Sequence, residues 1–195
     1  MYTRKFLLTL SVLGLFITTA LSQRCPPSGN GKTAKEKHLN ILKNHSARIP
    51  VKQSQVLPLN LFITRSHKPD SSKFKEGAYV TVEGFILDFA EEGPESCNCN
   101  KGSKSKKTGD VHIALALSSK SKKSNCMIVE ITPSFKKLHP DYQKYLVEKS
   151  KVRITGYLVY DYLHEANAAT TCGSCTNVWR KTCWEIHPIT KIEVL

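Results

Sequence analysis

Residues 79–89 read YVTVEGFILDF, and this stretch decides the fold. Polar and apolar residues alternate along it, and β-branched and aromatic side chains are frequent, as in a strand with one buried face. Gly84 in its middle indicates a bulge or a sharp bend of the kind a small barrel needs. A second stretch with a central glycine, VRITGYLVY, occupies residues 152–160. Two bent strands of this type favour a small closed barrel.

Three shorter β-rich stretches complete the set. They are VHIALAL (111–117), CMIVEIT (126–132) and TCWEIHPITKIEV (182–194), the last interrupted by Pro188. Helix formers fill residues 133–149, and Pro140 is expected to begin the main helix at its first turn. The order β-β-β-α-β-β is that of the OB-fold, a five-stranded Greek-key barrel with, here, an N-terminal extension. Immunoglobulin-like sandwiches lack the internal helix and rank lower.

The first residues have the pattern of an export signal. Arg4 and Lys5 precede an almost unbroken apolar run at residues 6–20, and small residues follow at 20 and 22. The run is shorter than the roughly 20 residues that a membrane span needs, although a retained N-terminal anchor is the alternative. We therefore expect a signal peptide at 1–22, no transmembrane segment in the mature chain, and a secreted protein in the periplasm or outside the cell.

Composition divides the remaining chain into two parts. Residues 23–76 read as an N-terminal extension that packs on the barrel, and residues 77–195 as the OB-fold-like domain. Within the extension, HLNILKN at 38–44 is expected to form one or two helical turns. Residues 55–64 are apolar enough for a strand or a strap over the barrel, and 65–76 read as a loop.

The formal net charge is +13, mostly from lysine. A basic protein of this kind favours polyanions such as nucleic acid or an anionic glycan, and solubility alone is the competing explanation. Two lysine-rich runs, KGSKSKK at 101–107 and SKSKKS at 119–124, flank one predicted strand at opposite ends. They contain no aromatic residue, so they do not indicate a base-stacking groove.

Alternation along the strands places a polar group on one face of the barrel. If Val111 and Val129 face the core, then His112 and Glu130 face outward, and the same alternation turns His187 outward. Antiparallel pairing brings His112 and Glu130 together. Residues that the two long predicted loops and the last strand add to this face complete the list of ligand-binding candidates: His112, Glu130, Asp161, His164, Trp179, Arg180, Glu185 and His187.

These residues admit more than one chemistry. His112, Glu130 and His187 are candidate ligands of zinc or another divalent metal that activates water. They are also candidates for general acid–base work, because histidine titrates near neutral pH. A structural polar network on a half-exposed sheet is the third interpretation. No HExxH or nucleophile-elbow motif occurs in the sequence, so no catalytic residue is identified.

Seven cysteines in an exported chain are expected to meet an oxidising compartment. Cys97 and Cys99 lie in one long loop, and Cys172 and Cys175 in the other. These four are candidates for disulfides between the loops, and alternatively for a four-thiolate zinc site. Cys126 and Cys183 begin neighbouring predicted strands and are candidates for a further disulfide.

Several stretches resemble a bacterial family of uncharacterised OB-fold-like proteins. The stretches are LNILKN (39–44), VEGFILD (82–88), GPESCNC (93–99), DVHI (110–113), VEITP (129–133), VRITGYLVYD (152–161) and CWEIHPITKIEV (183–194). ESCNC and WEIHP are the most distinctive. The resemblance covers about residues 39–195 and implies the fold and the candidate positions, not an activity. His45 and the CGSC pair at 172–175 depart from the pattern.

Three functions are consistent with these features. The first is an exported binding module for an acidic or polyanionic ligand, favoured by the net charge. The second is a metal-dependent hydrolase, phosphodiesterase-like, that uses the His/Glu cluster. The third is a structural or interaction domain held together by disulfide bonds.

Overall fold

The computed structural model describes residues 25–63, 75–100 and 109–195. The expected signal peptide, most of the expected loop at 65–76 and the lysine run at 101–107 lie outside the described residues. No helix in the described ranges is both long enough and apolar enough to cross a bilayer.

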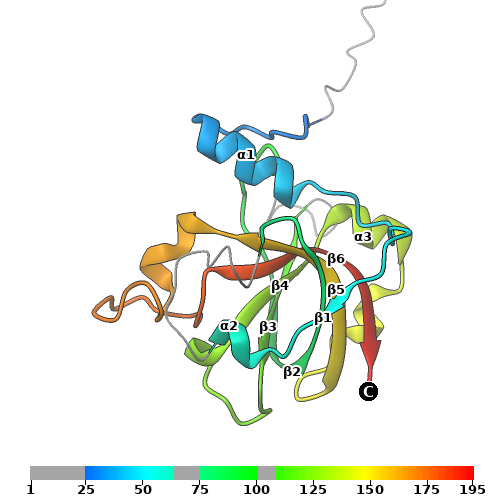
Figure 1. Ribbon diagram of the computed structural model, residues 1–195, viewed down its shortest axis with the longest axis vertical. Helices are drawn as coiled ribbons and strands as arrows, with labels where there is room; N and C mark the ends of the chain where they lie inside the picture. The colour runs from blue at the N-terminus through cyan, green and yellow to red at the C-terminus, as the bar shows by residue number, and fades with distance from the viewer. Residues whose placement is uncertain (1–24, 64–74, 101–108) are drawn as a thin grey trace, which may run out of the picture.

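Five strands close into a barrel (Figure 1). They are β2 (Tyr79–Glu91), β3 (Val111–Ala116), β4 (Met127–Ile131), β5 (Lys151–Tyr160) and β6 (Trp184–Val194). Along the sheet the order is β2-β3-β4-β6-β5, and pairing of β2 with β5 closes the circle. Only β4 and β6 run parallel among these five pairs. This topology confirms the predicted OB-fold-like barrel.

One long strand, β2, closes the barrel because it bends. Its first half pairs with β5 and its second half with β3, and Phe85 takes part in both ladders. At Gly84 a Cβ atom would lie 2.8 Å from Leu115 and Leu59, so only glycine permits this close approach. The register of the pairing between β2 and β3 shifts slightly farther along the strand, between Ile86 and Asp88. The sequence therefore located the bend correctly.

The barrel core follows the predicted alternation. Val111, Ile113 and Leu115 of β3 are buried in one apolar cluster with Met127 and the inward residues of the other strands. Two apolar residues that share the inward parity of these strands are exposed. Leu117 lies just after the end of β3, and Val194 is the last residue of β6.

The helix between β4 and β5 differs from the prediction. α3 (Pro133–Leu138) begins at Pro133, because the Thr132 side chain accepts a hydrogen bond from the Phe135 amide and caps the helix. Pro140 follows the end of α3 instead of beginning a helix. The rest of the segment contains only a 3-10 turn, η2 (Tyr142–Tyr145). Two further 3-10 segments are η1 (Lys123–Asn125) and η3 (Tyr162–Asn167).

The segment before the barrel supplies a strap and a cap. β1 (Gln55–Val56) pairs in parallel with β2, and α2 (Asn60–Ile63) follows it and adds Phe62 and Ile63 to the barrel core. α1 (Ala34–Lys43) begins at a Thr33–Glu36 capping box, four residues before the predicted helix. α1 lies outside the barrel and contacts β5 and β6 (Figure 1).

A buried ammonium group attaches α1 to the barrel. The Lys43 side chain is 3% exposed, and its Nζ lies 2.7 Å from Asp161 Oδ2 and 3.3 Å from Glu185 Oε1. Asp161 follows β5 and Glu185 lies on β6. The last turn of α1 is therefore held by charge at the barrel surface.

Substitution of Gly156 should destabilise the barrel through overpacking. A Cβ atom on Gly156 would lie 2.3 Å from the Pro188 carbonyl oxygen and 2.5 Å from Ile186 Cγ2. We expect Gly156→Ala to lower the free energy of unfolding by about 3 kcal/mol, measured by urea denaturation. Gly93→Ala is the control, because a Cβ there meets no described atom within 4 Å. Equal stability of the two variants would contradict the close approach.

Removal of the Lys43 charge should destabilise the protein at least as strongly as Gly156→Ala does. Lys43→Met leaves the carboxylates of Asp161 and Glu185 buried without their cation, which costs about 3–5 kcal/mol. Lys37→Met changes an exposed lysine of the same helix and should stay within about 0.5 kcal/mol of the parent. Chemical denaturation measures both. A Lys43→Met protein as stable as the Lys37→Met protein would show that the buried ion pair does not hold α1.

Candidate functional site

The barrel face opposite the apolar core carries a group of charged side chains. His112 on β3 pairs directly with Glu130 on β4, and Glu185 and His187 lie on the adjacent β6. The predicted juxtaposition of His112, Glu130 and His187 is therefore present. The predicted solvent exposure is wrong: Glu130 is 0% and His187 1% exposed. α1 and the two long loops, which the strand pattern alone did not place, cover this face.

Close contacts link these residues into a row. Glu92 Oε2 lies 2.9 Å from His112 Nδ1, and His112 Nε2 lies 2.9 Å from Glu130 Oε1. The other Glu130 oxygen lies 3.0 Å from His187 Nδ1. His187 Nε2 then faces Asp110 Oδ2 at 3.7 Å. The two histidines are thus separated by one fully buried carboxylate.

A second set of contacts continues from β6 toward α1. Arg180 Nη2 donates to Glu185 Oε2 at 3.0 Å, and the arginine side chain is completely buried. Lys43 joins Glu185 to Asp161 and also lies 3.4 Å from Glu95 Oε1. The Asp161 carboxylate in turn contacts His164 Nδ1 at 2.8 Å.

We call these residues the charged cluster. Its members are Lys43, Glu92, Glu95, Cys97, Asp110, His112, Glu130, Asp161, His164, Arg180, Glu185 and His187. All eight predicted binding candidates lie in or against it, since Trp179 stacks on His112 with ring centroids 6.0 Å apart. Sequence reasoning missed Lys43, Glu92, Glu95 and Asp110. Two of them, Asp110 and Glu95, lie in the DVHI and ESCNC stretches that carry the family resemblance.

Burial and mutual contact shift the pKa values of the cluster. Burial opposes the charge on His187, but Glu130 and Glu185 beside it raise its pKa to about 10. Burial raises the pKa of Asp110 to about 7, against the opposing effect of His187. Burial also opposes ionisation of Glu130, yet His112 and His187 hold its pKa well below the usual range. These shifts favour an ionised Glu130 carboxylate and a protonated His187 ring within the row.

Several atoms of the charged cluster approach one another without hydrogen-bond geometry. Among the described residues, buried atoms that make no hydrogen bond include both carboxylate oxygens of Glu130, Glu185 Oε1, Asp110 Oδ1, His112 Nε2 and His187 Nδ1. Buried polar atoms in proteins are normally hydrogen-bonded. Most of these atoms lie 2.9–3.3 Å from an oppositely charged partner in the ion pairs given above, whereas Asp110 Oδ1 has neither a hydrogen bond nor an ion pair within the described chain.

Two pockets lead to the cluster from outside. One, of about 250 Å³, is lined by Lys43, Glu95, Cys97 and His164 together with residues of α1 and the loop at 93–97. The other, of about 170 Å³, is bordered by Glu92, His112, Trp179 and Lys123 and has Ala114 and Ile128 in its wall. One pocket therefore borders the Glu92–His112 end of the row, and the other borders Lys43, Glu95 and Cys97 of the cluster.

The cysteines pair differently from the prediction. Disulfides join Cys25 to Cys99 and Cys172 to Cys175. No disulfide links the two long loops, because the first loop pairs with the segment before α1 and the second pairs within itself. The proposed four-thiolate zinc site is therefore excluded.

Three cysteines remain free thiols among the described residues. Cys126 and Cys183 are both buried and unpaired, so the expected disulfide between them is absent. Cys97 is also free and buried. Its Sγ donates to Glu95 Oε2 at 3.1 Å, and burial together with Glu95 raises the pKa of the thiol.

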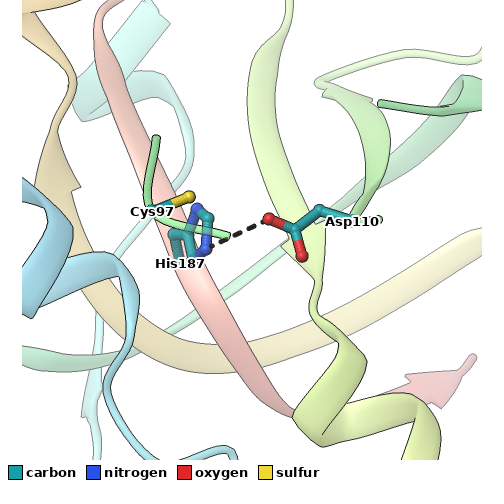
Figure 2. A group of neighbouring side chains, drawn as sticks. All are labelled: Cys97, Asp110 and His187. Atoms are coloured by element: carbon teal, nitrogen blue, oxygen red, sulfur yellow. Dashed lines mark ion pairs between the residues drawn. The ribbon is translucent and has the colours of Figure 1, made fainter. Parts of the chain in front are cut away.

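Cys97, Asp110 and His187 form the first of several groups that can hold a metal ion, here called the thiol site. Each offers a ligand atom, and these atoms lie within 4.8 Å of one another. Figure 2 shows the Cys97 sulfur beside the His187 ring and the Asp110 carboxylate directed toward the same ring. Zinc bonds of about 2.0–2.3 Å bring ligand atoms to nearly this spacing, so a small inward shift suffices.

Glu130 occupies the position of an orienting carboxylate for this group. If His187 binds a metal through Nε2, which faces Asp110, its Nδ1 remains next to Glu130 at 3.0 Å. Carboxylates placed in this way fix the ring orientation of metal-binding histidines. His112 on the far side of Glu130 then holds that carboxylate in turn. Glu130, Glu185 and His187 form an alternative donor group on the Nδ1 side.

Comparison with known proteins assigns no family to this chain. No protein-family model matches the chain, and no curated protein matches it. Two structures of the asparaginyl-tRNA synthetase from Entamoeba histolytica align with TM-scores of 0.37 and 0.39, at 17% and 16% identity over 73% and 74% of this chain. The chain spans 24% of either synthetase. The OBody AM1L10 bound to hen egg-white lysozyme aligns with a TM-score of 0.35 and 12% identity, over 67% of this chain and 93% of its own. These similarities carry no functional conclusion.

Proposed function

We propose that this protein is an exported metal-dependent hydrolase, and that its barrel binds one divalent ion of the zinc type at the thiol site. The convergence of Cys97, Asp110 and His187 beside a pocket carries the proposal. Thiolate, imidazole and carboxylate are the ligands that zinc takes from proteins. Three protein ligands leave a fourth position for water, which is the arrangement of catalytic rather than structural zinc.

Glu95 is placed to take the proton from that water. Its carboxylate lies 3.1 Å from Cys97 Sγ, is 14% exposed, and borders the pocket of about 250 Å³. A metal ion lowers the pKa of a bound water to about 7, so a carboxylate can accept its proton near neutral pH. The water oxygen then bonds to the electrophilic atom of an ester, the ester bond breaks, and the proton passes from Glu95 to the leaving oxygen.

An anionic substrate agrees with the distribution of charge. Four acidic residues of the charged cluster are buried, namely Asp110, Glu130, Asp161 and Glu185, whereas lysines such as Lys120 and Lys122 are exposed at the outer surface. A positive surface attracts negatively charged molecules and increases their rate of encounter. His164 lines the pocket of about 250 Å³ with 23% of its side chain exposed, while the Lys43 ammonium group that also lines it is paired with Asp161 and Glu185.

Export supplies the conditions that the cysteines require. Two disulfides indicate an oxidising compartment such as the periplasm or the extracellular space. Cys97 remains a free thiol beside the pocket of about 250 Å³, where its sulfur could coordinate a metal ion.

Metal analysis tests this function. Purified protein equilibrated with zinc and then dialysed should retain the metal, and Cys97→Ala should remove it or weaken its binding at least about 10-fold. Elemental analysis measures the bound ion. Cys126→Ala is the matched control, because Cys126 is an equally buried free thiol that lies away from the cluster donors. Retention of the same zinc content by both variants, or no retained metal in the parent protein, would contradict the proposal.

A second candidate function is binding of a polyanion without catalysis, by the lysines of the surface. Lys120 and Lys122 are exposed in the turn after β3, and the basic residues outnumber the acidic ones by 13 in the whole chain. This function needs neither the thiol site nor a metal ion. It places the ligand on the outside of the barrel rather than in the charged cluster.

Salt dependence tests the second candidate. Affinity for a DNA duplex should fall with rising salt, because phosphate contacts release counterions. Replacement of Lys120 and Lys122 by alanine should reduce the slope of log affinity against log salt by about one for each lysine. His187→Ala should leave the slope unchanged. Salt-independent binding, or a slope that responds to His187 instead of the lysines, would reject surface polyanion binding.

A further inference from the structure

We infer that the charged cluster holds a second divalent metal ion beside the first, bound by Glu92, Glu95 and His112, and that the substrate is therefore a phosphate ester. We call these three residues the outer site. The inference rests on the proposed function, because the first ion occupies the thiol site. It adds a metal position and a substrate class to that function.

The donor atoms of the outer site are already close together. Ligand atoms of Glu92, Glu95 and His112 lie within 4.8 Å of one another. All three side chains are partly exposed, and Glu92 and His112 border the pocket of about 170 Å³. Two carboxylates and one imidazole suit zinc or manganese. The site is therefore open to ions and to a substrate.

The outer site adjoins the thiol site through Glu95. Glu95 belongs to the outer site, and its Oε2 also contacts the Cys97 sulfur at 3.1 Å. Glu95 and Asp110 offer further ligand atoms within 4.8 Å of each other and of Glu130. Two ions bound at these positions would share neighbouring carboxylates, as two-metal centres do.

One carboxylate oxygen of Asp110, a member of the thiol site, is buried and makes no hydrogen bond. Asp110 is 1% exposed, and its Oδ1 makes no hydrogen bond within the described chain, while Oδ2 accepts one from Asn98. An ionised carboxylate oxygen in that state lacks a partner of opposite charge. A metal ion next to Asp110 and Glu95 would supply it.

The balance of charge also favours two ions over one. Six carboxylates belong to the charged cluster, namely Glu92, Glu95, Asp110, Glu130, Asp161 and Glu185, against the permanent cations Lys43 and Arg180. The Cys97 thiolate of a metal-bound site adds one more negative charge. With His112 and His187 bound to metal as neutral imidazoles, these groups have a formal charge of −5, which one divalent ion reduces to −3 and two ions reduce to −1.

Two adjacent ions fit the chemistry of phosphate esters. Such pairs stabilise both the attacking and the leaving oxygen of an in-line displacement at phosphorus. One ion would bind the water whose oxygen attacks phosphorus, and the other would bind the leaving ester oxygen as its bond to phosphorus breaks. A carboxylic ester needs only one ion to polarise its carbonyl group, whereas hydrolysis of a phosphate ester would use the ions of both sites.

Metal stoichiometry tests the second ion. Purified protein that is equilibrated with zinc and then dialysed should contain two zinc ions per chain by elemental analysis. Glu92→Gln should contain one, Cys97→Ala one, and the double variant none. Glu92 is partly exposed, so its substitution preserves the fold, and Glu148→Gln is the control at an exposed glutamate. A parent protein with one ion, unchanged in Glu92→Gln but lost in Cys97→Ala, overturns the outer site and leaves the proposed function standing.

Activity provides the second measurement. Zinc-loaded parent protein should hydrolyse bis(p-nitrophenyl) phosphate. Glu92→Gln should lose most of this activity, whereas the exposed control Glu148→Gln should keep it. Hydrolysis of the phosphate ester by Glu92→Gln at the rate of the parent would overturn the assignment of phosphate esters to the two-ion centre. Absence of both bound metal and hydrolysis in the parent would overturn the proposed function and this inference together.

Discussion

Glu130 is the residue on which the arrangement of the charged cluster depends. It is completely buried, and an isolated carboxylate in such a position would be prohibitively unstable. His112 and His187 contact its two oxygens from opposite sides at 2.9 and 3.0 Å. The three side chains come from three adjacent strands, so the barrel ladder itself fixes their spacing. Every other charge in the cluster lies where it completes or balances this row.

The barrel can bury this row because its strands present two different faces. Inward residues of β3, β4 and β6 form an ordinary apolar core, while alternate residues on the same strands are charged. In a barrel with a bare outer face these charges would be solvated. Here α1 and the two long loops exclude water from them, and the low-dielectric surroundings strengthen each interaction. Burial therefore makes an unpaired charge in the cluster strongly destabilising, and it strengthens the attraction between charges that are paired.

The part of this arrangement that lies within strands could be predicted from the sequence. A period of two fixed which residues of β3, β4 and β6 share a face, so His112, Glu130, Glu185 and His187 could be grouped correctly. The stretches that carry the family resemblance also converge: LNILKN brings Lys43, GPESCNC brings Glu95 and Cys97, DVHI brings Asp110 and His112, VEITP brings Glu130, VRITGYLVYD brings Asp161, and CWEIHPITKIEV brings Glu185 and His187. Six of the seven stretches thus contribute a residue to the charged cluster, and VEGFILD at 82–88 contributes none.

The cover over the face could not be predicted, because its contacts join segments far apart in the chain. Lys43 reaches Asp161 across a separation of 118 residues, and the Cys25–Cys99 bond spans 74. Neither contact follows from any local period or spacing. The helix after β4 was predicted wrongly for a different reason. The prediction followed the helix formers after Pro140, whereas the side-chain cap of Thr132 determines where α3 begins.

The same long-range contacts hold in place the loop that carries Cys97, one of the three residues of the thiol site. Asn44 at the end of α1 donates to the Cys97 carbonyl at 2.8 Å, and Ser96 donates to Asn40 at 3.1 Å. The Cys25–Cys99 disulfide ties the other end of this loop to the segment before α1. A catalytic group on an isolated loop would be poorly positioned, but this loop is bound on two sides to a helix that is itself bound to the barrel by Lys43. Rigid support of this kind keeps donor atoms near the geometry that a metal ion requires. The helix before the barrel is thus as much a part of the site as the strands that carry Glu130 and His187.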